Sequence, residues 1–117
     1  MPYNYVMPRR TTKRSPNEAA TESRYIPAAT RRAVYARDGL QCAYCRTTKG
    51  AMELDHVKPH SKRGRSTARN LVVACAKCNG LKSDWPLVLF AARLQMEGRG
   101  DADKILARVY ARLTLKE

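Results

Sequence analysis

Two Cys-x-x-Cys pairs, Cys42/Cys45 and Cys75/Cys78, constrain the fold of this 117-residue chain more than any other feature. Four thiolates complete a tetrahedral zinc site and leave no open coordination position, so a zinc ion held by them would be structural. A chain of this length is most simply one domain with a thin core, which a bound metal commonly reinforces. The spacing therefore predicts one domain stapled by Zn²⁺.

Two disulfides or free core thiols are the alternative uses of the four cysteines. The N-terminus, which begins Met1-Pro2-Tyr3-Asn4-Tyr5, lacks the apolar segment of a signal peptide. We therefore expect a cytoplasmic protein, bacterial or phage-encoded and not secreted. In that reducing compartment paired Cys-x-x-Cys motifs indicate zinc.

The charge balance points to an anionic partner. The chain has 23 Lys and Arg against 10 Asp and Glu, a formal net charge of +13. Nucleic acid is the expected partner, because neutralising phosphates releases counterions and drives association. A membrane surface is disfavoured, since no apolar run approaches 18 residues.

Composition divides the chain into three parts. Residues 1–24 contain prolines and a basic cluster without apolar periodicity, which predicts a flexible basic arm. Residues 25–85 are the expected metal-stapled domain. Residues 86–117 are expected to form a helical hairpin packed on that domain.

Local patterns predict the elements within these parts. We expect a helix over residues 27–37 that stops at Asp38-Gly39, a strand over 51–57, and a basic loop over 60–69. The apolar run at 70–74 is too short to assign by its period, and 79–84 is expected to be a short helix.

The hairpin has its own signals. Asp84 with Pro86 can start its first helix, a turn follows at 98–100, and Asp101 can cap the second helix. The apolar faces expected are Leu87, Val88, Ala91 and Leu94 on the first helix and Ile105, Leu106, Val109, Tyr110 and Leu113 on the second.

Asp55-His56 and Asn79 carry the chemistry that the cysteines do not. About 29 residues separate Cys45 from Cys75, enough for a strand-loop-strand excursion whose two ends are pinned at the metal. The excursion carries Asp55-His56, and Asn79 follows Cys78 directly, so the metal can bring them together reproducibly. Neutral imidazole is a suitable base near pH 7, and carboxylate and amide oxygens suit Mg²⁺ or Mn²⁺.

Four ordered motifs carry a family resemblance. They are Arg37-Asp38-Gly39-Leu40-Gln41-Cys42-x-x-Cys45, Leu54-Asp55-His56-Val57-x-Pro59, Asn70-Leu71-Val72 and Cys75-x-x-Cys78-Asn79. This combination, over roughly residues 31–85, resembles the zinc-containing HNH endonucleases with the ββα-metal fold. The resemblance implies an α+β protein with a ββα-metal core, flanked here by an N-terminal helix and the C-terminal hairpin.

The resemblance also implies roles for four residues. His56 aligns with the general base, and Asn70 with the residue that orients the base and stabilises its loop. Asn79 aligns with a ligand of the catalytic metal, alongside the carboxylate of Asp55. The implied activity is metal-dependent hydrolysis of DNA phosphodiester bonds, as nicking or double-strand cleavage, that leaves 5′-phosphate and 3′-hydroxyl ends.

Basic side chains near this constellation are candidate contacts to DNA phosphates: Arg37, Lys58, His60, Lys62, Arg63, Arg65 and Lys82. His60 lies four residues after His56, but Pro59 argues against a helical pair of metal ligands. The chain departs from the family at Lys62-Arg63-Gly64-Arg65, where two successive glycines are common. An arginine there can alter the turn.

Each site residue also has a structural alternative. Asp55 could cap a turn before Pro59, and Asn70 could cap the element that follows it. His56 could be a satisfied histidine at a strand end, and Asn79 could close the zinc knuckle in the left-handed region. The corresponding alternative function is a non-catalytic, zinc-stabilised nucleic-acid-binding module of a phage or mobile-element complex. Under either interpretation a protein partner can supply sequence specificity, and the oligomeric state is open.

Overall fold

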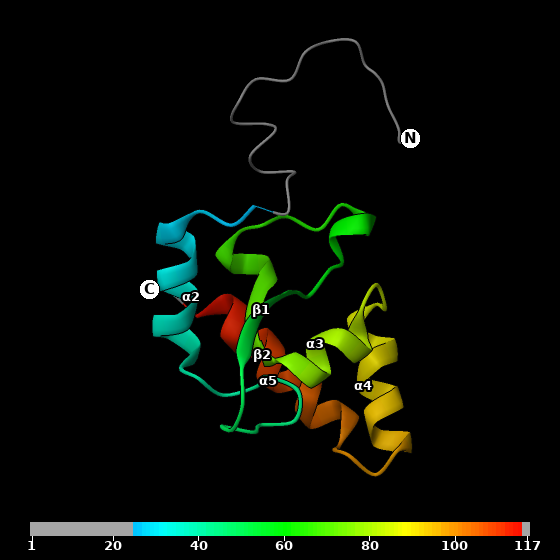
Figure 1. Ribbon diagram of the computed structural model, residues 1–117. Coiled ribbons are helices and arrows are strands. Elements are labelled where there is room, and N and C mark those ends of the chain that lie inside the picture. Colours follow the sequence, from blue (N-terminus) through cyan, green and yellow to red (C-terminus); the bar gives the residue numbers. More distant parts are fainter. Residues whose placement is uncertain (1–24, 116–117) are drawn as a thin grey trace, which may run out of the picture.

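A computed structural model describes residues 25–115, and the predicted basic arm over 1–24 lies outside them. At the centre lies a two-stranded antiparallel sheet, β1 (Met52–His56) and β2 (Leu71–Cys75), visible in Figure 1. Met52 pairs with Cys75 at one end, and His56 pairs with Leu71 at the other. The chain therefore leaves the first knuckle along β1 and returns to the second along β2, as the spacing of the cysteines predicted.

Short 3-10 turns, η1 (His60–Lys62) and η2 (Ala68–Asn70), shape the loop between the strands. The run at 70–74, unassignable from its period, is strand because it pairs with β1 and is buried along its whole length. Both faces of β2 are covered, which explains why its sequence shows no alternation.

Two helices flank the sheet. Helix α2 (Ala28–Asp38) ends at Gly39, whose φ of 71° is the left-handed conformation that glycine favours, as predicted. Helix α3 (Ala76–Lys82) begins three residues before the predicted start because Cys75 Sγ accepts a hydrogen bond from Cys78 N and caps it. The order β1, β2, α3 confirms the predicted α+β class and its ββα core.

The C-terminal end of α2 is fastened to the outer edge of β2. Arg37 donates from Nη2 to Leu71 O (2.5 Å) and from Nη1 to Ala68 O (2.7 Å), and Asp38 Oδ2 accepts from Val73 N (3.0 Å). The Arg37 side chain is only 2% exposed. Its predicted role as a phosphate contact is therefore wrong, because its guanidinium serves the strand edge and cannot reach DNA.

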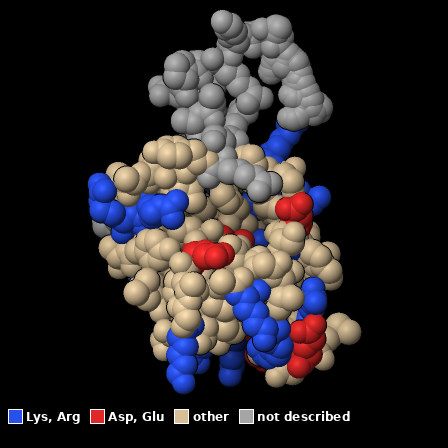
Figure 2. Space-filling model, viewed as in Figure 1, with Lys and Arg blue, Asp and Glu red and all other residues tan. Residues whose placement is uncertain are grey.

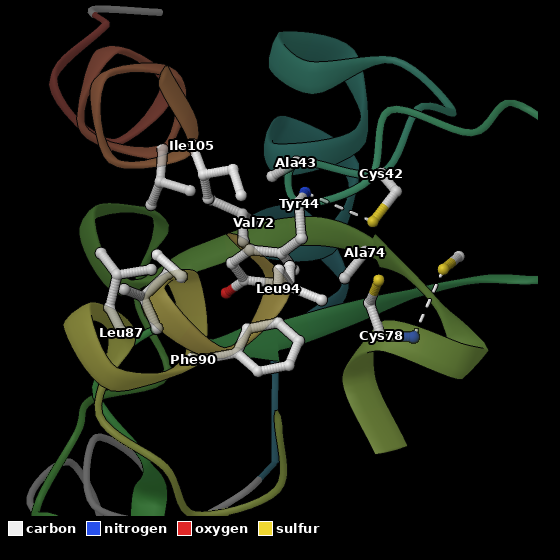
Figure 3. Close-up of a cluster of buried hydrophobic side chains, with 14 residues drawn as sticks. Cys42, Ala43, Tyr44, Val72, Ala74, Cys78, Leu87, Phe90, Leu94 and Ile105 are labelled. Atoms are coloured by element: carbon white, nitrogen blue, oxygen red, sulfur yellow. Dashed lines mark hydrogen bonds between the residues drawn. The ribbon is translucent and has the colours of Figure 1, made fainter. Parts of the chain in front are cut away.

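Helices α4 (Leu87–Met96) and α5 (Ala102–Thr114) form the C-terminal hairpin, and Asp101 caps α5 by accepting from Lys104 N at 3.0 Å, as predicted. Buried side chains of both helices join those of β2 and the first knuckle in one core (Figure 3). None of the helices in the described part of the chain has the length and hydropathy that a membrane span needs.

The predicted apolar faces need two corrections. Val88 is 56% exposed, and Phe90 takes its place in the core beside Leu87, Ala91 and Leu94. Val88 follows Leu87 directly and so points about 100° away around the helix. On α5, Tyr110 is 51% exposed, while Ile105 and Val109 are buried.

Two arginines of α5 hold the first Cys-x-x-Cys knuckle. Arg108 Nη1 donates to Ala43 O at 2.8 Å, and Arg112 Nη1 donates to Gln41 O at 2.9 Å. Burial lowers the pKa of both guanidinium groups without removing their charge at neutral pH. The hairpin thus supports the metal site as well as the core.

Candidate active site and metal centre

The four cysteine sulfurs meet where the first knuckle faces the start of α3. All four Sγ atoms lie within 4.8 Å of one another, and Cys45 Sγ is 3.7 Å from Cys75 Sγ. A tetrahedron with Zn–S bonds of about 2.3 Å has S···S edges of about 3.8 Å, whereas a disulfide requires about 2.05 Å. The four residues therefore fit zinc, and all four are free cysteines.

The surroundings favour thiolates. Cys42 Sγ accepts hydrogen bonds from the backbone N–H groups of Tyr44 and Cys45 at 3.3 and 3.4 Å. Its hydrogen bond with the Cys78 side chain is the main cause that lowers the pKa of Cys42 to about 4, and the same bond raises the pKa of Cys78. A zinc ion in place of the shared proton would bind both sulfurs as thiolates.

A pocket of about 330 Å³ lies beside β1 and the end of α3. Its lining residues are Ile26, Leu54, Asp55, His56, Pro59, His60, Asn79, Ser83 and Asp84. The structure therefore places Asp55, His56 and Asn79 around one cavity. Within residues 25–115, β1 has a partner strand along one edge only. Leu54 to His56 are consecutive, and successive strand side chains point to opposite faces, so the pocket reaches around the other edge of β1.

Asp55 is held by two buried side chains. Its Oδ2 accepts a hydrogen bond from Tyr44 OH (2.5 Å) and lies 3.2 Å from Lys82 Nζ. Burial raises the pKa of Asp55, and the nearby Lys82 and the Tyr44 hydrogen bond oppose that rise. Among the described residues Oδ1 makes no hydrogen bond or ion pair, so it is the oxygen available to a metal ion.

Lys82 serves the interior of this site. It is fully buried, and its Nζ also donates to His56 O at 2.9 Å. The predicted contact between Lys82 and a DNA phosphate is therefore wrong. The ammonium group instead neutralises the Asp55 carboxylate and fixes the backbone of His56.

The His56 imidazole lines the pocket and touches the loop between the strands. Its Nε2 lies 2.8 Å from Ser66 Oγ, and Ser66 is 4% exposed. The His60 ring stands edge-on to it, with 5.7 Å between the ring centroids. His60 is thus a pocket residue as well as a loop residue.

Asn79 lies inside α3, so the alternative in which it closes the zinc knuckle in the left-handed region is wrong. Among described non-glycine residues, positive φ occurs at Arg46, Arg63 and Ser83. Asn79 Nδ2 donates to Glu53 Oε1 at 2.7 Å. That bond fixes the amide so that its Oδ1 acceptor remains for a ligand in the pocket.

Asn70 fastens the loop that follows His56. Its Oδ1 accepts from Lys58 N (2.8 Å), and its Nδ2 donates to Lys58 O (3.0 Å) and Arg65 O (2.9 Å). Gly64 lies where the two sides of this loop approach each other, and a Cβ added to it would stand 1.7 Å from Lys58 O. The neighbouring Arg63 takes the left-handed conformation, with φ of 71°, in the turn where the resemblance led us to expect glycine.

The remaining predicted phosphate contacts are on the surface. Lys58, Lys62, Arg63 and Arg65 are exposed and lie in the loop between the strands. On the face shown in Figure 2, Lys and Arg side chains gather in several separate groups, with smaller acidic groups among them near the centre and at the right edge.

Sequence reasoning missed four residues that surround the site, namely Tyr44, Glu53, Ser66 and Asp84. Each acts through a partner distant in the chain or, in the case of Asp84, through a pocket assembled from several elements. The only available signal was the place of Tyr44 inside the first Cys-x-x-Cys pair, where the metal restricts its position.

Comparison with known proteins identifies the segment. Residues 42–84 match the family described as HNH endonuclease, which confirms the resemblance that the motifs carried. A segment of 65 residues, 53% of this chain, is 37% identical to a CRISPR-associated endonuclease Cas9 of Corynebacterium diphtheriae. They are 40% identical over 58 positions, 47% of this chain, to a CRISPR-associated endonuclease Cas9 of Actinomyces naeslundii. The matched segments span about 6% and 5% of those relatives. No solved structure matches.

Proposed function

We propose, from the HNH-family segment at residues 42–84 and its pocket, that the protein is a metal-dependent endonuclease that hydrolyses DNA phosphodiester bonds. One observation carries the proposal. Asp55, His56 and Asn79 come from β1 and α3, and they line the same pocket beside the four-cysteine site. A module that only binds nucleic acid has no need for a base and two oxygen ligands around one cavity.

Two oxygens in this pocket suit a catalytic Mg²⁺ or Mn²⁺. Asp55 Oδ1 and Asn79 Oδ1 are hard ligands. Tyr44 and Lys82 hold the Asp55 side chain through Oδ2. Glu53 holds the Asn79 side chain through Nδ2. When bound there, the ion would stabilise charge on the phosphate and on the leaving oxygen. The Lys82 ammonium opposes the effect of burial on Asp55 and so favours the charged carboxylate that a cation requires.

His56 supplies the base in this proposal. The imidazole takes a proton from the attacking water, while the Lys82 bond to its carbonyl and the Asn70 bonds in the next loop keep it in place. Attack on the phosphorus with departure of the 3′ oxygen would leave 5′-phosphate and 3′-hydroxyl ends.

The exposed cations of the 58–65 loop are proposed to hold the DNA backbone. Lys58, Lys62, Arg63 and Arg65 follow His56 directly in the chain, so phosphates bound to them lie near the pocket. Each contact that is lost should reduce the salt dependence of binding, log K against log salt, by about 0.9. Arg65→Gln should do so without an effect on folding, because Asn70 binds the carbonyl of Arg65 and not its guanidinium.

The test is relaxation of supercoiled plasmid by zinc-loaded protein from which weakly bound divalent ions have been dialysed. A strong chelator is unsuitable as the negative control, because it also removes structural zinc. We expect no nicking without added metal, nicking with Mg²⁺ or Mn²⁺, and a large loss in Asp55→Asn.

Asp103→Asn is the matched control, since Asp103 is exposed on α5 away from the pocket. Retardation of the plasmid without cleavage in any metal would reject the proposal. It would favour the non-catalytic binding module.

A further inference from the structure

We propose that Tyr44 is a positioning residue that couples the four-cysteine site to the catalytic divalent ion through Asp55. The zinc site would then set the affinity for that ion as well as the fold. The inference rests on the proposed function, because the catalytic ion belongs to it. The coupling itself can be measured by metal binding, without cleavage.

Tyr44 contacts both sites. It lies between Cys42 and Cys45, and its backbone N–H donates to Cys42 Sγ at 3.3 Å (Figure 3). At the far end of the side chain its hydroxyl donates to Asp55 Oδ2 at 2.5 Å. The direction of this bond is fixed when Asp55 is charged, because a carboxylate only accepts. One residue therefore joins a sulfur of the first knuckle to the carboxylate that borders the pocket.

The side chain between these two contacts is held rigidly. Tyr44 is 1% exposed, and its ring packs edge-on against Phe90 of α4, with 5.2 Å between the ring centroids. Two torsion angles place a tyrosine ring, and close packing in a core restricts both of them. A displacement of the knuckle therefore moves the hydroxyl instead of being absorbed by the side chain.

The second knuckle reaches the same carboxylate oxygen. Lys82 follows Cys78 by four residues on α3, and its Nζ lies 3.2 Å from Asp55 Oδ2. Each knuckle thus supplies one donor to Oδ2, and the zinc ion that joins the knuckles fixes the two donors relative to each other. Holding Oδ2 also fixes the direction of Oδ1, because both oxygens belong to one planar carboxylate.

Loss of the Tyr44 hydroxyl should weaken binding of the catalytic ion and leave the zinc in place. Removing a group that orients a metal ligand costs about 10–100-fold in metal affinity. Lys82 still holds Oδ2 in Tyr44→Phe, so we expect the lower end, an increase of about tenfold in the dissociation constant for Mn²⁺. Phenylalanine keeps the ring and its packing on Phe90, and the four thiolates are unchanged.

The first experiment is titration of the zinc-loaded protein with Mn²⁺, with the free ion measured by electron paramagnetic resonance. Mn²⁺ prefers oxygen ligands and does not displace zinc from thiolates. Asp55→Asn identifies the binding that occurs in the pocket. Tyr35→Phe is the matched control, because the Tyr35 hydroxyl also donates to β1, at Met52 O (3.2 Å), and neither residue lines the pocket.

We expect weaker Mn²⁺ binding in Tyr44→Phe, unchanged binding in Tyr35→Phe, and the wild-type zinc content in both. Equal affinity in Tyr44→Phe and the wild type would overturn the coupling. Equal weakening in the two tyrosine variants would overturn it as well, since the effect would not depend on the contact with Asp55.

A second measurement uses the wild type alone and so requires no variant to fold. ¹¹³Cd²⁺ takes the place of zinc on the four cysteines, and its NMR resonance responds to hydrogen bonds at the sulfurs. Added Mg²⁺, which does not compete for thiolates, should shift this resonance with the same midpoint at which it displaces Mn²⁺ from the pocket. A resonance that Mg²⁺ leaves unmoved would overturn the coupling.

Nicking then separates positioning from a general loss of structure. Tyr44→Phe should nick more slowly than the wild type at low Mg²⁺ and approach its rate at saturating Mg²⁺, whereas a defect that persists at saturation would contradict the proposal. If the wild type does not nick, the proposed function is rejected, and the Mn²⁺ affinities still decide the coupling. If the affinities are equal while the wild type nicks, the coupling is rejected and the nuclease stands.

Discussion

Replacing Lys82 with methionine tests how the interior of the site is stabilised. Methionine retains the unbranched, flexible stem and removes the ammonium group. That group lies 3.2 Å from Asp55 Oδ2 and 2.9 Å from His56 O, and the residue is fully buried. Lys82→Met therefore leaves a buried carboxylate without its counter-charge and a carbonyl without its donor.

The expected cost follows from that geometry. Removing one partner of a buried ion pair destabilises a protein by about 3–5 kcal/mol. Asp55 keeps the Tyr44 hydrogen bond and borders the pocket, which places the cost near the lower end, about 3 kcal/mol. A loss of that size is a large fraction of the roughly 5–15 kcal/mol that stabilises a typical domain.

The pH dependence of this cost has a definite sign. Burial raises the pKa of Asp55, and Lys82 opposes the rise, so the pKa in Lys82→Met is higher still. Since a protonated carboxyl needs no counter-charge, the cost is full above the pKa of Asp55 in the folded variant. It shrinks as the pH falls through that value. The stability that the variant loses relative to the wild type should therefore decrease as the pH is lowered, and a loss that grows on acidification would contradict this sign.

The assay is urea unfolding at fixed free zinc, followed by circular dichroism and by the fluorescence of Trp85, the single tryptophan. Lys77→Met is the control, because Lys77 is exposed on the same helix and its removal changes the net charge equally. A difference of less than about 1 kcal/mol between the two variants would refute the account, since exposed charges contribute about that much or less.

Three further predictions concern the metal and the backbone. Chelation of zinc should abolish the helical circular dichroism signal and added Zn²⁺ should restore it, because zinc binding contributes folding free energy; a folded zinc-free protein would contradict this. Arg112→Met should lower the free energy of unfolding by about 1.5–3 kcal/mol, because the hydrogen bond to Gln41 O in the first knuckle is lost. Lys104→Met, on the exposed side of α5, is the control and should change it little. Equal effects of the two substitutions would refute the role of Arg112 in holding the knuckle. Gly64→Ala should destabilise by about 1–3 kcal/mol because its Cβ would meet Lys58 O, and Gly80→Ala in α3, with open space around it, should not; tolerance of Gly64→Ala would mean that the loop shifts freely.

The sequence predicted the elements that the metal controls. Both ends of the excursion are pinned at the cysteines, so a strand-loop-strand between them, and the approach of Asn79 to Asp55 and His56, followed from spacing alone. Gly39 and Asp101 were found because their terminal roles depend on local backbone chemistry.

Arg37 and Lys82 were mispredicted for a physical reason. Fully buried cations are rare, so a basic residue beside a nucleic-acid site is assumed to face solvent unless its partners are known. The partners of Arg37 are backbone carbonyls 31 and 34 residues later in the chain. The partners of Lys82 are the His56 carbonyl, 26 residues earlier, and the neighbouring Asp55 carboxylate. Pairings at such separations depend on the packed fold and leave no local pattern.

Ser66 and Glu53 illustrate the same limit within the site. Ser66 meets His56 through the loop that the Asn70 hydrogen bonds hold closed, and Glu53 meets Asn79 through the packing of α3 on β1. The residues that carry the chemistry were recognisable by type and order, whereas the residues that orient them required the three-dimensional structure.

The most direct test of the central claim compares the plasmid-nicking rates of His56→Ala and His60→Ala, both zinc-loaded, in Mg²⁺ or Mn²⁺. The two histidines line the same pocket, with ring centroids 5.7 Å apart, so the pair separates the base from a neighbour of the same chemistry. We predict that His56→Ala loses about 10²–10⁴-fold in rate while it keeps its zinc, fold and DNA affinity, and that His60→Ala loses much less. Undiminished nicking by His56→Ala would contradict the assignment of the base and the account of the site built on it.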